Sequence, residues 1–312
     1  MSALQMAVLG PVQVQLNERL LRFATRKEVA LLVYLALEGS QASRRQMIQL
    51  LWPESEARQA RSSLRATLHR LREALGEVGP PDKEALLHLE ADTLSLNPAF
   101  TITLDLHEVQ TAWSLAHTRI SAPSLSAEER QEVIAVLGHT IEIVRGPFME
   151  DFQIQDAAPF EAWIRVQREH WHLRIQEIFE HLTQLQEQAG FVAAALETAL
   201  RWYAFDLLNE KAARQLMRLH DALGNRHAAL QLYDTLVEHM QVELHARPAP
   251  ETIALAQQLR TRATPVTHTP NRATTIGAPV SWLRPPLVGR ETEMGELIKH
   301  YEQALSGYPQ VV

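Results

Sequence analysis

The sequence predicts a mainly α-helical protein in which a small α+β domain precedes an all-α domain of paired helices. Near the N-terminus, and again over residues 85–96, apolar residues alternate with polar ones, as expected for half-buried strands. From residue 106 onward Gly and Pro become sparse and the apolar period is that of a helix. The 312 residues are about twice the length of a typical domain, so two or three domains are expected.

The first predicted elements are short strands joined by turns. Alternation predicts strands over Leu4–Val8 and Val12–Leu16. A third strand over Leu20–Phe23 follows the turn residues Asn17 and Glu18.

Two helices are predicted after these strands. Thr25 is a candidate N-cap for a helix over Arg26–Glu38. Ser43, with Gln46 three residues later, matches a capping box and predicts a short second helix through Trp52.

The third predicted helix, from about Glu54 to Leu75, has a narrow apolar stripe and a basic flank. At 100° per residue, the apolar side chains fall within about 40° of Leu64, which predicts one buried face. This stripe consists of Ala60, Leu64, Leu68, Leu71 and Leu75. The basic flank consists of Arg58, Arg61, Arg65, His69 and Arg72, with Ser62 beside it.

A hairpin completes the first domain, residues 1–105. Its strands are predicted over Ala85–Leu89 and Thr93–Leu96, around the turn Glu90-Ala91-Asp92. Strands, three helices and a hairpin in this order predict a winged helix-turn-helix. In that fold the last helix enters the major groove of DNA, where arginine reads guanine and other basic groups hold phosphates.

The distribution of charge agrees with this interpretation, although the formal net charge of the chain is −7. Residues 1–105 hold 12 basic and 12 acidic side chains, and residues 106–262 hold 14 and 21. Between residues 40 and 72 there are seven arginines against two glutamates, a local charge of +5. The alternative is a basic but merely solvated helix face. The predicted DNA-binding residues are Arg44, Arg45, Arg58, Arg61, Ser62, Arg65, His69, Arg70 and Arg72.

The second domain, residues 106–262, is predicted to consist of helices in a repeat of the tetratricopeptide (TPR) type. Gly190-x-x-x-Ala194-Ala195-Leu196 recurs 34 residues later as Gly224-x-x-x-Ala228-Ala229-Leu230. The predicted helices are Leu106–His117, Glu128–Arg145, Phe160–Gln188, Val192–Trp202, Glu210–Leu223, Arg226–Gln241 and Glu251–Arg262. A generic protein-binding scaffold is the alternative interpretation of this domain.

Several motifs carry a family resemblance across both domains. In the first domain they are Leu9-Gly10, Trp52-Pro53, Ser63-Leu64-Arg65 and Leu68-His69-Arg70-Leu71-Arg72. In the second they are Arg145–Phe152, Trp163 followed by Arg165, Arg168 and Glu169, and Pro248-x-Pro250-Glu251-Thr252. The chain resembles Streptomyces antibiotic regulatory proteins, in which an OmpR-type winged helix precedes a bacterial transcriptional activator domain.

The resemblance implies a cytoplasmic bacterial transcription regulator, with activation as the expected direction. It places base and phosphate contacts on the third helix, at Arg58, Arg61, Ser62, Arg65 and His69. It also implies promoter direct repeats in double-stranded DNA as the target, self-association into a homo-oligomer, and contacts with RNA polymerase subunits. One departure is the acidic hairpin turn Glu90-Ala91-Asp92, which puts a contact between the wing and DNA in doubt.

The last 50 residues divide into a predicted linker and the start of another domain. Residues 263–286 carry five prolines and five threonines, which is typical of an extended linker. Residues 287–312, which begin Leu287-Val288-Gly289-Arg290-Glu291, resemble the start of an NTPase domain in a larger regulator. The chain has no G-x-x-x-x-G-K-[ST] motif, so nucleotide binding is expected only if such a domain follows. A tail with a chance motif is the alternative.

Other chemistry is predicted to be absent. The chain has no cysteine, which excludes disulfides and thiolate metal sites, and its 14 histidines form no H-E-x-x-H motif. No catalytic motif, signal peptide or membrane-spanning segment is apparent, so we expect neither an enzyme nor a cofactor, metal or membrane protein. Two alternative functions remain open: a protein–protein adaptor, and the sensor-side arm of an NTPase switch.

Overall fold

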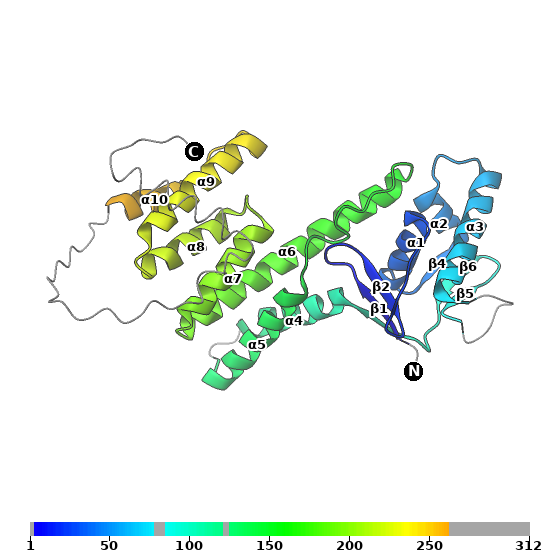
Figure 1. The fold of residues 1–312 in the computed structure, drawn as a ribbon, viewed down its shortest axis with the longest axis horizontal. Helices are drawn as coiled ribbons and strands as arrows, with labels where there is room; N and C mark the ends of the chain where they lie inside the picture. The colour runs from blue at the N-terminus through cyan, green and yellow to red at the C-terminus, as the bar shows by residue number, and fades with distance from the viewer. Residues whose placement is uncertain (1–2, 78–84, 121–124, 262–312) are drawn as a thin grey trace, which may run out of the picture. The chain divides into compact units, whose positions relative to one another are not determined.

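The computed structural model describes residues 3–77, 85–120 and 125–261, which belong to one compact unit spanning residues 1–262 (Figure 1). The predicted linker 263–286 and the segment 287–312 lie outside the described residues. The predicted fold class is confirmed: small sheets and three helices come first, and helices alone form the rest. No helix among the described residues is long and apolar enough to cross a membrane.

Two small sheets frame the first part of the chain. The first has the strand order β3-β2-β1-β7, where β1 runs antiparallel to β2 and parallel to β7. The second has the order β4-β6-β5, and its antiparallel pair β5–β6 is the predicted hairpin. The strands are β1 Ala3–Ala7, β2 Gln13–Leu16, β3 Arg19–Leu20, β4 Gln41–Ser43, β5 Leu87–Leu89, β6 Thr93–Leu96 and β7 Thr101–Leu104. The sequence patterns missed β4 and β7 and placed the third strand too far along the chain.

Three helices pack between these sheets: α1 Arg26–Leu37, α2 Arg44–Leu51 and α3 Ala57–Leu75. One half of the predicted capping box is present, because the Oγ of Ser43 accepts from the Gln46 N–H at 3.1 Å, whereas the Gln46 side chain donates to the Tyr34 hydroxyl. Thr25 is the N-cap residue of α1, as predicted, but its side chain makes no capping hydrogen bond and its hydroxyl instead donates to Oε1 of Glu28 at 3.1 Å. Helix α3 begins three residues later than predicted, because the backbone turns after Trp52, where the Ser55 N–H bonds the Trp52 carbonyl.

The second part of the chain consists of helices joined by turns in the residues that the structure describes. The helices are α4 Asp105–Ile120, α5 Ala127–Ile143, α6 Ala158–Gln188, α7 Val192–Phe205, α8 Glu210–Ala222, α9 Arg226–Leu244 and α10 Pro250–Thr261. The sequence repeat is also a structural repeat, because Gly190 and Gly224 both end a helix with φ of +79°. The N–H of each glycine bonds the carbonyl three residues before it, at 2.9 Å in both cases.

The turn over residues 145–152 joins the helical part to the end of β1. The N–H groups of Gly10 and Met149 bond Pro147 O and Val8 O across this junction, at 2.9 and 2.7 Å. The Arg168 side chain on α6 donates to three carbonyl oxygens of the turn, those of Phe148, Met149 and Phe152. The winged helix is therefore fixed to the helical part through backbone hydrogen bonds as well as side chains.

Candidate nucleic-acid interface

The buried face of α3 is the stripe that the sequence predicts. Ala60, Leu64, Leu68, Leu71 and Leu75 are all buried. Gly76 ends the helix in the left-handed region, with φ of +82°. Because the apolar face is fixed by packing, the opposite face of α3 is held in one orientation toward solvent.

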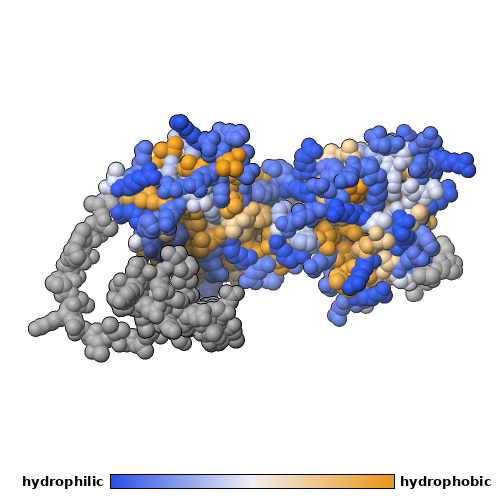
Figure 2. Space-filling model, turned by 45° about the horizontal axis from the view of Figure 1, so that its top comes forward, coloured by the Kyte–Doolittle hydropathy of each residue, from blue (hydrophilic) through white to orange (hydrophobic). Residues whose placement is uncertain are grey.

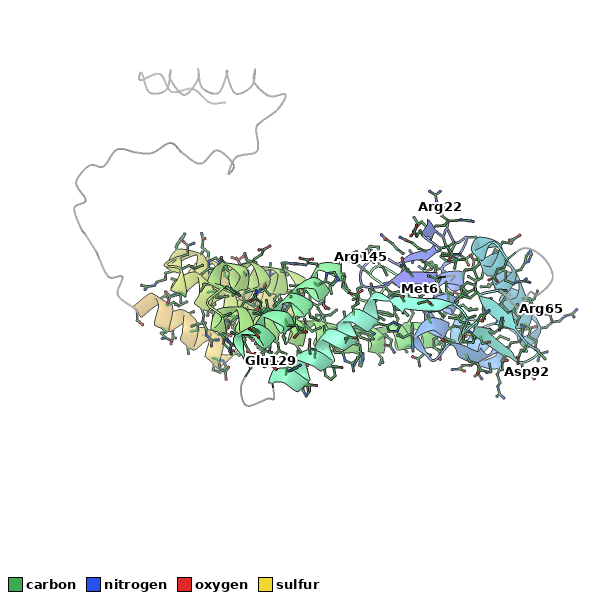
Figure 3. All side chains as sticks on the ribbon, turned by 90° about the horizontal axis from the view of Figure 1, so that it is seen from below. Met6, Arg22, Arg65, Asp92, Glu129 and Arg145 are labelled. Carbon is green, nitrogen blue, oxygen red and sulfur yellow. The ribbon has the colours of Figure 1, made fainter. Side chains whose placement is uncertain are left out.

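The exposed face of α3 presents three arginines without acidic partners. Arg58, Arg61 and Arg65 are exposed, and among the described residues their side chains make no hydrogen bond or ion pair. Ser62 is exposed beside them, and Figure 3 shows Arg65 extending outward from the helix. His69 is exposed as well and lies 3.5 Å from Glu73. The structure therefore brings five of the nine predicted site residues onto one continuous surface, which we call the α3 basic face.

The two arginines that begin α2 have different surroundings. Arg44 is tied to the hairpin turn, because its N–H donates to Asp92 O and its Nε to Glu90 O, at 2.8 and 3.0 Å. Arg45 is exposed. The turn residues Glu90 and Asp92 are exposed too, so the hairpin presents acid rather than base at its tip (Figure 3).

Arg70 does not belong to the exposed face, and the structure gives it another role. Its Nε lies 2.7 Å from Oε1 of Glu28 on α1, a carboxylate whose side chain is 0% exposed. Glu28 also accepts from the Ala24 N–H and the Thr25 hydroxyl. The structure therefore pairs Arg70 with Glu28 inside the winged helix, and the contact between Arg70 and DNA stays a prediction. Arg72, the remaining predicted residue, is half-buried in the last turn of α3.

Sequence reasoning missed Glu28, although a signal was present. Glu28 precedes Leu31, Leu32 and Leu35 by three, four and seven residues, so it lies on the apolar face of α1. A carboxylate on such a face needs a buried partner, and Arg70 supplies it.

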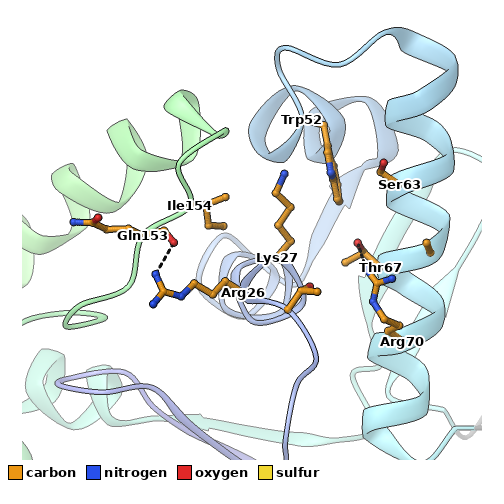
Figure 4. A pocket seen from close by; sticks show the side chains of 10 residues that line it. Arg26, Lys27, Trp52, Ser63, Thr67, Arg70, Gln153 and Ile154 are labelled. Carbon is orange, nitrogen blue, oxygen red and sulfur yellow. Dashed lines mark hydrogen bonds between the residues drawn. The ribbon is translucent and has the colours of Figure 1, made fainter.

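A cavity of about 430 Å³ lies between α1, α3 and the loop that leads into α6 (Figure 4). Its cations are engaged: Arg26 donates to Gln153 O at 3.0 Å, and Lys27 lies 2.7 Å from Asp156. Lys27 also stacks over the Trp52 ring. Because these contacts connect α1 to the helical part, the cavity belongs to the junction that positions α3.

Asp105, like Glu28, is a carboxylate that the sequence analysis did not identify, and it lies at the junction with the helical part. Its Oδ2 accepts from the N–H groups of Val8 and Leu9, at 2.8 and 2.9 Å. Burial raises the pKa of this carboxyl, and the two backbone hydrogen bonds oppose that shift. No cluster of three or more potential metal ligands occurs within the described ranges.

Comparison with known proteins locates the second part of the chain in a family. The sequence model described as "Bacterial transcriptional activator domain" matches residues 105–260. The regulatory protein AfsR of Streptomyces griseus is 26% identical over 259 residues, which cover 82% of this chain and 24% of AfsR. The transcriptional regulatory protein MoaR1 of Mycobacterium tuberculosis is 24% identical over 262 residues, covering 82% of this chain and 79% of MoaR1. The chain therefore spans about a quarter of the length of AfsR and most of that of MoaR1.

A solved structure shares the fold. Mycobacterium tuberculosis EmbR, determined in complex with a low affinity phosphopeptide, superposes with a TM-score of 0.60. The sequence identity is 21%, and the match covers 83% of this chain and 65% of that chain.

Proposed function

The chain belongs to the bacterial transcriptional activator domain family and is a regulator of the Streptomyces antibiotic regulatory protein type, and from that premise we propose that it binds promoter DNA through α3. The observation that carries this proposal is the α3 basic face. Arg58, Arg61 and Arg65 are spaced by three and four residues, so they form one row along the helix.

The dimensions of the α3 basic face suit the major groove. Residues 58–69 span about 16 Å along the helix at 1.5 Å per residue, or roughly five base-pair steps of 3.4 Å. Arginine forms bidentate hydrogen bonds with guanine, and serine and histidine can contact bases or phosphates. Because no carboxylate in the described structure pairs with these three guanidinium groups, DNA binding requires no internal ion pair to break.

The hairpin is proposed to orient α2 rather than to contact DNA. Arg44 joins the start of α2 to the hairpin turn, and the exposed Glu90 and Asp92 would repel phosphates. Arg45 remains available for a phosphate beside the groove.

The helical part is proposed to support self-association on direct repeats and contacts with RNA polymerase. Eight of the nine large apolar side chains exposed in the described structure lie between residues 166 and 244. Figure 2 shows hydrophobic patches interrupting the hydrophilic surface on the face that it presents. Exposed apolar surface of this kind is typical of protein–protein contacts. The acid excess of residues 106–262 would keep this part away from DNA.

The proposal can be tested by selecting bound genomic fragments and then titrating the recovered sites in mobility-shift assays. Arg61→Ala and Arg65→Ala are each expected to weaken binding by about tenfold or more. Arg165→Ala, which removes an exposed arginine of α6, is the matched control and should bind as the unaltered chain does. Recovery of no preferred sequence, together with a stable protein partner in pull-downs, would favour the adaptor alternative.

A further inference from the structure

A small polar pocket in the helical part lies between α6, α7 and α8. Its volume is about 180 Å³, and its walls include Lys211, Arg214 and Arg218 of α8 and Trp202 of α7. The one carboxylate in its lining is that of Glu180 on α6. Residues 106–262 contain 14 basic and 21 acidic side chains, whereas the lining of this pocket contains three basic side chains and one acidic side chain.

The three cations lie on one face of α8, and one of them is not engaged. Lys211 Nζ lies 3.2 Å from Oε2 of Glu180. Arg214 donates to Thr252 Oγ1 at 2.8 Å and lies 3.9 Å from Oε2 of Glu210. Arg218 is exposed and makes no hydrogen bond or ion pair with any residue that the structure describes. Its guanidinium therefore offers several N–H donors at the edge of the pocket.

Trp202 provides a second, independent observation. The residue is 2% exposed, and its Nε1 has no hydrogen-bond partner among the described residues. A buried N–H without an acceptor is unusual, because most buried polar groups in folded proteins are paired. An acceptor placed in the pocket that Trp202 lines could satisfy this N–H together with the Arg218 donors.

We propose that this pocket binds a side-chain carboxylate from an acidic peptide segment of a partner protein. The planar guanidinium of Arg218 matches a carboxylate in a bidentate geometry, and the pocket volume suits one side chain rather than a duplex. Glu180 would repel a doubly charged phosphate more than a carboxylate. This site uses no residue of α3, so it does not depend on DNA binding and provides a separate surface for a partner.

The test measures binding of a labelled peptide to the purified chain by fluorescence anisotropy. The probe is Gly-Ser-Asp-Glu-Asp-Glu-Gly-Ser with an amidated C-terminus, and the control peptide carries Asn and Gln in place of Asp and Glu. We expect saturable binding of the acidic peptide alone, weakened about tenfold by Arg218→Ala. Arg165→Ala, which makes the same change of charge elsewhere in the helical part, should leave affinity unchanged within about twofold.

A second readout separates specific binding from general attraction of charge. The indole N–H resonance of Trp202, assigned by its loss in Trp202→Phe, should shift when the acidic peptide is added. Absence of saturation up to about 1 mM peptide would overturn the proposal, as would equal effects of Arg218→Ala and Arg165→Ala. Displacement of the peptide by an equal concentration of inorganic phosphate would overturn the choice of a carboxylate. Promoter affinity should be the same in Arg218→Ala as in the unaltered chain.

Discussion

Replacing Arg70 by alanine is expected to destabilise the winged helix without removing a DNA contact. The substitution leaves the carboxylate of Glu28, which is 0% exposed, without the guanidinium that lies 2.7 Å away. Breaking a buried ion pair by removing one partner costs about 3–5 kcal/mol. We expect the lower end, about 3 kcal/mol, because the Arg70 side chain is 38% exposed and Ala24 and Thr25 still donate to Glu28.

The assay is thermal and urea unfolding followed by circular dichroism, with promoter affinity measured where each variant remains folded. At roughly 2–4 °C per kcal/mol, the midpoint of unfolding should fall by about 6–12 °C. Glu28→Gln in the Arg70→Ala background should restore part of the stability, because it removes the buried charge. The matched variant Arg65→Ala should show the opposite pattern, with weaker DNA binding and nearly unchanged stability. Unchanged stability with a tenfold loss of DNA affinity in Arg70→Ala would refute the structural role of this arginine.

Three further predictions concern the helical part and its junction with the winged helix. Arg168→Ala removes the donor to three carbonyl oxygens of the turn 145–152, so it should lower the free energy of unfolding by about 3 kcal/mol. Hydrogen exchange at the Gly10 and Met149 amides should become faster, and unchanged protection of these amides would contradict the prediction. Gly10→Ala should lower the free energy of unfolding in urea by about 1–3 kcal/mol, because φ of Gly10 is +105° and an added Cβ would lie 3.0 Å from the Arg145 Cβ. A decrease below about 0.5 kcal/mol would count against this prediction. The hydrogen bond from His172 holds the pKa of Asp206 below its ordinary 3.8, so the native state binds fewer protons at Asp206 than the unfolded state does. The resulting stability is present above pH 3.8 and is lost as the pH falls through the pKa of the folded state. Asp206→Asn should therefore flatten the dependence of unfolding free energy on pH below about pH 4, and an unaltered slope would exclude this role.

The order of elements could be predicted because each carries a local signal. The apolar stripe of α3 and the 34-residue repeat both follow from spacing along one helix or one pair of helices, and the structure confirms both. The strands β4 and β7 could not be predicted in this way. Each has only three or four residues, and each is defined by a partner distant in sequence, such as Leu104 of β7 beside Met6 of β1.

The candidate site shows the same limit. Periodicity identifies which arginines face solvent, and it placed Arg58, Arg61 and Arg65 correctly on the exposed side of α3. It cannot identify an ion pair between helices, so the pairing of Arg70 with Glu28, 42 residues away, was not predicted. The contacts of Arg44 with the hairpin turn were not predicted for a related reason, because their acceptors lie 46 or more residues away.

The salt dependence of promoter binding tests the central claim most directly. The affinity of the unaltered chain and of the double variant Arg61→Ala/Arg65→Ala should be measured over a series of salt concentrations. Each phosphate contact contributes about 0.9 to the slope of log affinity against log salt. We predict that the double variant binds at least about tenfold more weakly, with a shallower slope if either arginine contacts phosphate. The same affinity and the same slope in both proteins would contradict the assignment of the α3 basic face to DNA.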